Sequence, residues 1–180
     1  MEAILEPTIT LDPDKEYEIV DGVPEEKEMA GARHGRVGAR LLTFINYHVI
    51  THDLGVVYGP DTTFKMERNE RLPDIAFVAA ERIPEEGDPE GSWNMAPDLA
   101  IEIISPNDVY VKVMNKVFDY FEEGVKQVWL VSPEHHTVTI YYSVTDDKIL
   151  GEHDFLTCEE LLPGFQCKVG DLFTLPKKRQ

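Results

Sequence analysis

A chain of 180 residues with 42% hydrophobic side chains is long enough for one domain with a substantial core, and its composition argues against disorder. The 17 basic and 34 acidic residues give a net charge of −17, which weakens a prediction of nucleic-acid binding, because phosphate recognition depends on clusters of lysine and arginine. A local strip of basic residues is still compatible with this net charge, because the net charge is a sum over the whole surface.

The sequence shows no sign of export or of insertion into a membrane. Residues 1–6, MEAILE, lack the basic segment and the apolar stretch of a secretory signal, and no apolar run is long enough to span a bilayer. Cys158 and Cys167 have no zinc-type spacing with histidine, and we expect two reduced thiols rather than a disulfide. These features predict a soluble cytoplasmic protein with no membrane partner.

The predicted elements begin after an N-terminal arm, residues 1–16, which is rich in proline and acid. Residues 17–23, YEIVDGV, predict a strand that enters an Asp-Gly hairpin turn. The acidic segments 25–28 and 85–90 predict solvated loops. Apolar residues at helical spacing predict a long helix over residues 31–52. The polar residues of this helix that could meet a ligand are Arg33, His34, Arg36 and Arg40.

The rest of the chain predicts several strands and a second helix, residues 110–123, which ends at Gly124. This order of elements predicts a single α/β domain over residues 17–180, in which one mixed sheet is flanked by helices. The predicted strands cover residues 56–58, 62–66, 75–79, 99–104, 127–131 and 137–144, and the turn-rich tail, residues 161–175, is compatible with one more.

The most informative residue is Glu102, an acid inside the apolar run LAIEII of residues 99–104. Such a run predicts a strand buried on both faces, where a carboxylate must be paired, hydrogen-bonded or bound to a metal. Asp74 opens the preceding apolar run. Two neighbouring strands could therefore bring two carboxylates together and hold a divalent cation with hard oxygen ligands. For each acid alone, a turn position for Asp74 or an ion pair for Glu102 remains an open alternative.

The helix over residues 110–123 adds a lysine to this pair of acids. Lys116 lies at the rim of the apolar arc of the helix, where its ammonium could reach the sheet edge and stabilise charge that develops on a phosphate. The alternative is a solvated helix face, on which Lys112 and Lys116 pair with Asp119 and Glu123.

The order of an aspartate, a glutamate on the next strand and a lysine on the following helix resembles the Uma-type family of the PD-(D/E)XK nuclease superfamily. The segments that carry the resemblance are Pro73-Asp74, residues 97–106 and residues 116–133, and the similarity runs from about residue 17 to the end of the chain. It implies a restriction-endonuclease-like α/β fold, in which a mixed β-sheet is flanked by α-helices and carries extra antiparallel strands.

The resemblance also implies a metal site. The carboxylates of Asp74 and Glu102, with the backbone carbonyl of Ile103, would hold Mg²⁺, for which Mn²⁺ could substitute. Glu18 matches a position that adds an outer acid near the metal. His34 matches a histidine at the start of the first long helix, and packing of its ring on the apolar face of that helix is the alternative.

The sequence departs from the superfamily pattern at the lysine. Ile104 stands where the lysine that usually follows the glutamate by two residues would be, and the family position on the next helix nominates Lys116. Lys112 stands where the family usually has an acid, which leaves open which of the two lysines is catalytic.

The resulting hypothesis is a metal-dependent endonuclease, a hydrolase of phosphodiester bonds that acts on nucleic acid, with DNA favoured, and that works as a homodimer. Catalysis would rest on Asp74, Glu102, Lys116 and Glu18, and the weaker candidates for phosphate binding are Arg33, His34, Arg36, Arg40 and Lys112. One alternative is an inactive nuclease fold that serves as a binding or dimerisation module. Another is a metal-dependent enzyme that hydrolyses a small phosphoester.

Overall fold

The central element of the fold is a six-stranded sheet with the order β10-β9-β8-β7-β6-β3. The computed structural model describes residues 11–27 and 30–175. Strands β7 and β8 are parallel and the other neighbours are antiparallel, so helix α2 (Tyr110–Glu122) forms the crossover between β7 and β8. The strands are β3 (Gly55–Tyr58), β6 (Ile75–Ala79), β7 (Leu99–Ile103), β8 (Gln127–Ser132), β9 (Thr137–Ser143) and β10 (Asp146–Leu150).

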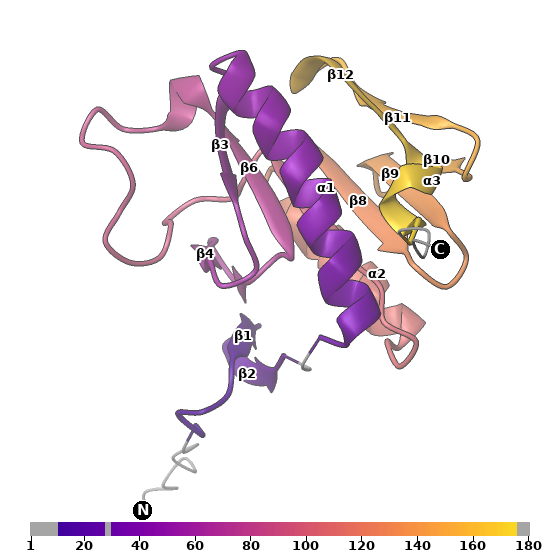
Figure 1. Cartoon of the computed structure of the whole chain (residues 1–180). Coiled ribbons are helices and arrows are strands. Elements are labelled where there is room, and N and C mark those ends of the chain that lie inside the picture. The colour runs from indigo at the N-terminus through magenta and orange to yellow at the C-terminus, as the bar shows by residue number, and fades with distance from the viewer. Residues whose placement is uncertain (1–10, 28–29, 176–180) are drawn as a thin grey trace, which may run out of the picture.

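Different elements cover the two faces of this sheet (Figure 1). Helix α1 (Ala32–Thr51) and the C-terminal elements pack on one face, and α2 packs on the other. The prediction that residues 99–104 form a strand buried on both faces is confirmed, since Leu99 and Ile101 belong to the core under α1 whereas Ala100 belongs to the core under α2. The C-terminal elements are β11 (Phe155–Cys158), β12 (Leu162–Lys168) and the short helix α3 (Val169–Phe173).

A smaller sheet with the order β2-β1-β5-β4 lies beside the main one (Figure 1). Asp21 and Gly22 have φ values of 50° and 79°, so the predicted Asp-Gly hairpin is confirmed between β1 and β2. Its strands are β1 (Tyr17–Val20), β2 (Val23–Glu26), β4 (Phe64–Lys65) and β5 (Glu70–Arg71), and a 3₁₀ turn η1 (Ala80–Arg82) follows β6.

Some expectations need correction. Glu25 and Glu26 belong to strand β2 rather than to a loop, because the hairpin pairs them with β1 while their side chains stay exposed. Strand β5 and helix α3 were not predicted, since both are too short to show periodicity. Residues 11–16 are an exposed segment, and the remainder of the expected arm lies outside the described residues.

Two further expectations concern the cysteines and the membrane. Cys158 and Cys167 are both free and buried, as expected for two separate thiols. Among the helices of the described ranges, none combines the length and the apolarity that crossing a bilayer requires.

Candidate functional site

Asp74 and Glu102 lie opposite each other at one end of the central sheet. Strand β6 runs antiparallel to β7 with Ile75 opposite Ile101, and one further step of this register places Asp74 opposite Glu102. Residues that are directly opposed across an antiparallel pair share a face of the sheet. The two acids are 7% and 8% exposed respectively, so the structure brings two nearly buried carboxylates to one place.

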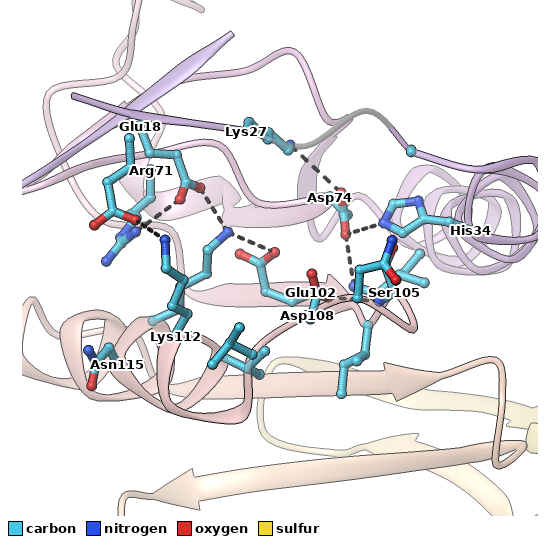
Figure 2. A pocket seen from close by; sticks show the side chains of 18 of the residues that line it. Glu18, Lys27, His34, Arg71, Asp74, Glu102, Ser105, Asp108, Lys112 and Asn115 are labelled. Carbon is cyan, nitrogen blue, oxygen red and sulfur yellow. Dashed lines mark hydrogen bonds and ion pairs between the residues drawn. The ribbon is translucent and has the colours of Figure 1, made fainter.

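A cavity of about 380 Å³ opens onto these two acids (Figure 2). The hairpin β1–β2, the start of α1, the end of β7 and the first turns of α2 surround it. Besides the two acids, the basic and acidic residues that line it include Glu18, Lys27, His34, Arg71, Lys112 and Lys116.

Hydrogen bonds from two elements hold Asp74 in place. Its Oδ2 accepts a bond of 2.8 Å from the backbone N–H of Ile103 and lies 3.0 Å from Nε2 of His34. Burial alone would raise the pKa of Asp74, but His34 and the nearby charge of Lys27 hold this pKa below its ordinary value. The same hydrogen bond raises the pKa of His34. His34 therefore orients an acid of the site through its Nε2.

The pKa of Glu102 is shifted in the opposite direction to that of Asp74. Its Oε1 accepts a hydrogen bond of 2.7 Å from the Tyr120 hydroxyl, and its Oε2 lies 3.5 Å from Nζ of Lys116. Burial raises the pKa of Glu102 to about 7; the charge of Lys116 opposes this rise, and the negative charges of Asp74 and Glu18 add to it. A cation beside Glu102 would relieve this crowding of acids.

Lys116 lies between two carboxylates. Its Nζ is 3.1 Å from Oε1 of Glu18 and 3.5 Å from Oε2 of Glu102. Although burial would lower the pKa of Lys116, these two acids raise it, so the ammonium stays charged at neutral pH. Glu18 is itself fixed by Arg71, whose NH1 donates a bond of 2.9 Å to its Oε2.

The alternative in which Lys112 and Lys116 pair with Asp119 and Glu123 along the helix is wrong. Asp119 pairs with Arg71 instead, and Glu123 accepts hydrogen bonds from the backbone N–H groups of Glu67 and Arg68. Lys112 pairs with Glu25 of the hairpin at 3.1 Å, and its side chain is 69% exposed at the edge of the cavity. Of the two lysines, the structure therefore places Lys116 at the acids.

The arginines of α1 lie elsewhere. Arg33 pairs with Glu134, while Arg36 and Arg40 donate to backbone carbonyls at the end of the chain, those of Phe173, Thr174 and Asp171. Arg33, Arg36 and Arg40 do not line the cavity. The expectation that these arginines bind phosphate at the acids is therefore not supported, because α3 and Thr174 engage Arg36 and Arg40 instead.

Three residues of the site were not predicted from the sequence, namely Tyr120, Arg71 and Lys27. Tyr120 belongs to α2 and is buried. A buried tyrosine must satisfy its hydroxyl, and this requirement was the signal that could have found it. Arg71 and Lys27 lie in irregular or very short segments, where periodicity gives no information about which way a side chain points.

The donors of the site fit a hard divalent cation. Asp74 and Glu102 provide two carboxylates on one face, and the backbone of Ile103 lies at the same cavity. Among the described residues, no group of three or more His, Cys, Asp or Glu side chains is arranged to hold a metal by itself. Mg²⁺ commonly takes one or two carboxylates from the protein and keeps several waters.

Comparisons with known proteins bear on the family and on the fold. A family model described as "Uma2: Putative restriction endonuclease" matches residues 4–170. A solved structure described as a putative nuclease belonging to DUF820, from Anabaena variabilis, is similar with a TM-score of 0.82 and 22% identity, over 91% of this chain and 93% of that chain. No curated protein matches the sequence. The structural likeness confirms the predicted α/β fold.

Proposed function

Because the chain belongs to the Uma2 family of putative restriction endonucleases, we propose that it is a Mg²⁺-dependent endonuclease that hydrolyses phosphodiester bonds of nucleic acid. The observation that carries this proposal is the meeting of Asp74, Glu102 and Lys116 at one cavity, although they come from separate elements of the chain. Two carboxylates and a charged lysine are the groups that such a hydrolysis needs.

The acids would hold the ion. Asp74 and Glu102, with the backbone carbonyl of Ile103, would bind Mg²⁺, or Mn²⁺ in its place. Bound there, the ion would act as a Lewis acid that polarises the phosphate and lowers the pKa of a water. His34 keeps Asp74 ionised and oriented through its contact of 3.0 Å, so that this ligand is ready before the ion binds.

Lys116 would stabilise the reacting phosphate. In the hydrolysis, a water loses a proton as its oxygen forms a bond to phosphorus, the bond to the leaving ester oxygen breaks, and that oxygen takes up a proton. Negative charge grows on the phosphate oxygens during this exchange, and a fixed ammonium stabilises it. Glu18 serves as a positioning residue, since it holds Lys116 at 3.1 Å while Arg71 holds Glu18.

Nucleic acid, with DNA favoured, is the proposed substrate, and a homodimer is the proposed assembly, because two sites are needed to cut both strands of a duplex. The net charge of −17 means that the metal and a few lysines must supply the attraction for phosphate.

The test is cleavage of labelled single-stranded and double-stranded oligonucleotides by metal-stripped protein with Mg²⁺ or Mn²⁺ added back. We expect Glu102→Gln to abolish cleavage without unfolding the protein. Lys116→Met should slow cleavage by roughly a hundredfold or more while the protein still binds Mn²⁺ at pH 8.5, where the ion does not compete with a proton on Glu102. Lys65→Met removes a lysine that pairs with Glu70 outside the cavity and serves as the matched control. Full activity in Glu102→Gln would contradict the proposal.

A small phosphoester is the second candidate substrate, since the cavity of about 380 Å³ is of a size for a small ligand and the protein is strongly acidic. Salt separates the two candidates, because a polymer loses affinity steeply as salt rises and a small ester does not. The inactive binding module is the third candidate. It predicts that oligonucleotide binding persists in both wild type and Glu102→Gln without cleavage by either.

A further inference from the structure

A second ammonium group, that of Lys27, reaches the acid pair from a different part of the chain than Lys116. Figure 2 shows Lys27 extending toward Asp74 from the segment that follows β2. Lys116 approaches Glu102 from α2. Each acid of the pair therefore has its own lysine, and Lys27 has no role in the function proposed above.

Backbone oxygens hold the ammonium of Lys27, rather than the acid that it faces. Its Nζ donates to the carbonyl of Leu72 at 2.8 Å and to that of Pro60 at 3.4 Å. The distance from Nζ to Oδ1 of Asp74 is 3.7 Å, which is too long for a hydrogen bond. The Lys27 side chain is only 15% exposed and lines the cavity. Its ammonium is therefore held in front of Asp74, where a ligand in the cavity can contact it.

The charge balance differs between the two lysines. Lys116 lies within 3.5 Å of two carboxylates, Glu18 and Glu102. Lys27 faces one carboxylate, Asp74, which already accepts hydrogen bonds from the N–H groups of other residues. A divalent cation on Asp74 would repel this ammonium unless an anion lay against both. An oxygen of a phosphate group meets that condition, and lysine binds phosphate as a point charge.

We propose that Lys27 is a second lysine of the active site and contacts a phosphate oxygen of the bound substrate on the Asp74 side. This inference rests on the proposed function, because it assumes a phosphate ligand at the cavity. The two ammonium groups then have different roles. Lys116 stabilises the charge that develops on the phosphate beside Glu102, and Lys27 binds a phosphate oxygen beside Asp74.

The experiment measures binding without cleavage. A fluorescein-labelled single-stranded DNA of twelve nucleotides is titrated with protein in Ca²⁺, at several salt concentrations, and its anisotropy is followed. We expect Lys27→Met to weaken binding by about tenfold and to reduce the slope of log affinity against log salt by about 0.7, the value for one lost contact to a single strand. Lys27→Arg keeps the charge and should bind within about twofold of wild type, as should the control Lys65→Met.

A structural role for Lys27 makes different predictions. If Lys27 only fastened its segment to the Leu72 carbonyl, Lys27→Met would lower the melting temperature and weaken Mn²⁺ binding in calorimetry, with no specific change in the salt slope. The proposal expects Mn²⁺ binding to be unchanged or tighter, because a positive charge 3.7 Å from Asp74 has been removed. DNA affinity in Lys27→Met equal to that of Lys65→Met, or weakened Mn²⁺ binding, would overturn the inference.

The outcomes also separate this inference from the nuclease proposal. A wild-type protein that cleaves nothing, while Lys27→Met still weakens DNA binding, refutes the nuclease proposal and supports the inference. Cleavage by wild type together with unchanged DNA binding in Lys27→Met refutes the inference alone. Absence of DNA binding by the wild type in Ca²⁺ overturns the inference, and absence of cleavage in Mg²⁺ and Mn²⁺ as well overturns both.

Discussion

Replacement of Glu102 by glutamine should make the metal-free protein more stable at neutral pH, although the same change should abolish activity. Glutamine has nearly the same shape and keeps an oxygen that can accept the hydrogen bond from Tyr120, but it cannot ionise. The perturbation therefore removes one charge from a buried position between Asp74 and Glu18.

The magnitude follows from the pKa of Glu102, which is raised from 4.5 to about 7 in the folded protein, mainly by burial. Between these two values the folded protein binds the proton more tightly than the unfolded chain does, so the free energy of unfolding falls as the pH rises from 4.5 to 7. At 1.36 kcal/mol for each unit of pKa, the ionised carboxylate costs about 3 kcal/mol above pH 7. Glutamine cannot ionise, so Glu102→Gln does not carry this cost.

Urea denaturation of both proteins in EDTA, from pH 4.5 to pH 8, measures the effect. The stability of Glu102→Gln relative to wild type should rise by about 3 kcal/mol over this range. The pKa of His34 is also raised, so the wild type loses stability from this group as well when the pH rises, and the comparison between the two proteins cancels most of that contribution. Glu86→Gln, at an exposed position, serves as the control and should show a flat difference.

Addition of metal should remove most of this difference at pH 8. Mn²⁺ at a hundred times its dissociation constant should stabilise the wild type by about 2.7 kcal/mol and leave Glu102→Gln unchanged. A difference between the two proteins that stays constant from pH 4.5 to pH 8, or a loss of stability in Glu102→Gln at pH 8 in EDTA, would refute the electrostatic reasoning.

The remaining predictions concern Asp74 and Arg71. Asp74→Asn should destabilise the metal-free protein by about 1–3 kcal/mol at pH 7, the opposite sign to Glu102→Gln, because the pKa of Asp74 is lowered and the fold stabilises its ionised form. The difference in urea midpoints should begin to shrink as the pH falls below 3.8 and should vanish only below the lowered pKa of the folded protein. Arg71→Met should destabilise by about 3 kcal/mol in thermal or urea unfolding, since it leaves two acids, Glu18 and Asp119, without their buried partner. A loss below about 0.5 kcal/mol, the size of an exposed pair, would show that this buried network carries no stability.

Much of the architecture follows from local patterns of the sequence. The Asp-Gly dipeptide at residues 21–22 places the first hairpin, and the apolar spacing of residues 31–52 predicts α1 to within a residue at each end. The apolar run around Glu102 correctly predicts a strand, β7, that is buried against a core on each face. These elements are predictable because their signals lie within a few neighbouring residues.

Other elements had no such signal. Strand β5 has two residues and α3 has five, so neither is long enough for its side chains to repeat with a period. The missing prediction of α3 led to a wrong expectation about the arginines of α1. Without α3, the arginines of α1 were expected to face a substrate, whereas Arg36 and Arg40 in fact donate to the chain around α3.

The apolar run around Glu102 was enough to show that this buried acid requires a partner or an ion, and Asp74, at the start of the preceding apolar run, was its candidate neighbour. The register that sets the two acids opposite each other, and the way in which the charges around them are shared, became visible only in the folded protein. The tertiary structure placed Lys116 between Glu18 and Glu102, Arg71 behind Glu18, and Lys27 in front of Asp74. The physical reason is that strand alternation and helical spacing act over a few residues, whereas an ion pair depends on the position of two side chains that can be a hundred residues apart.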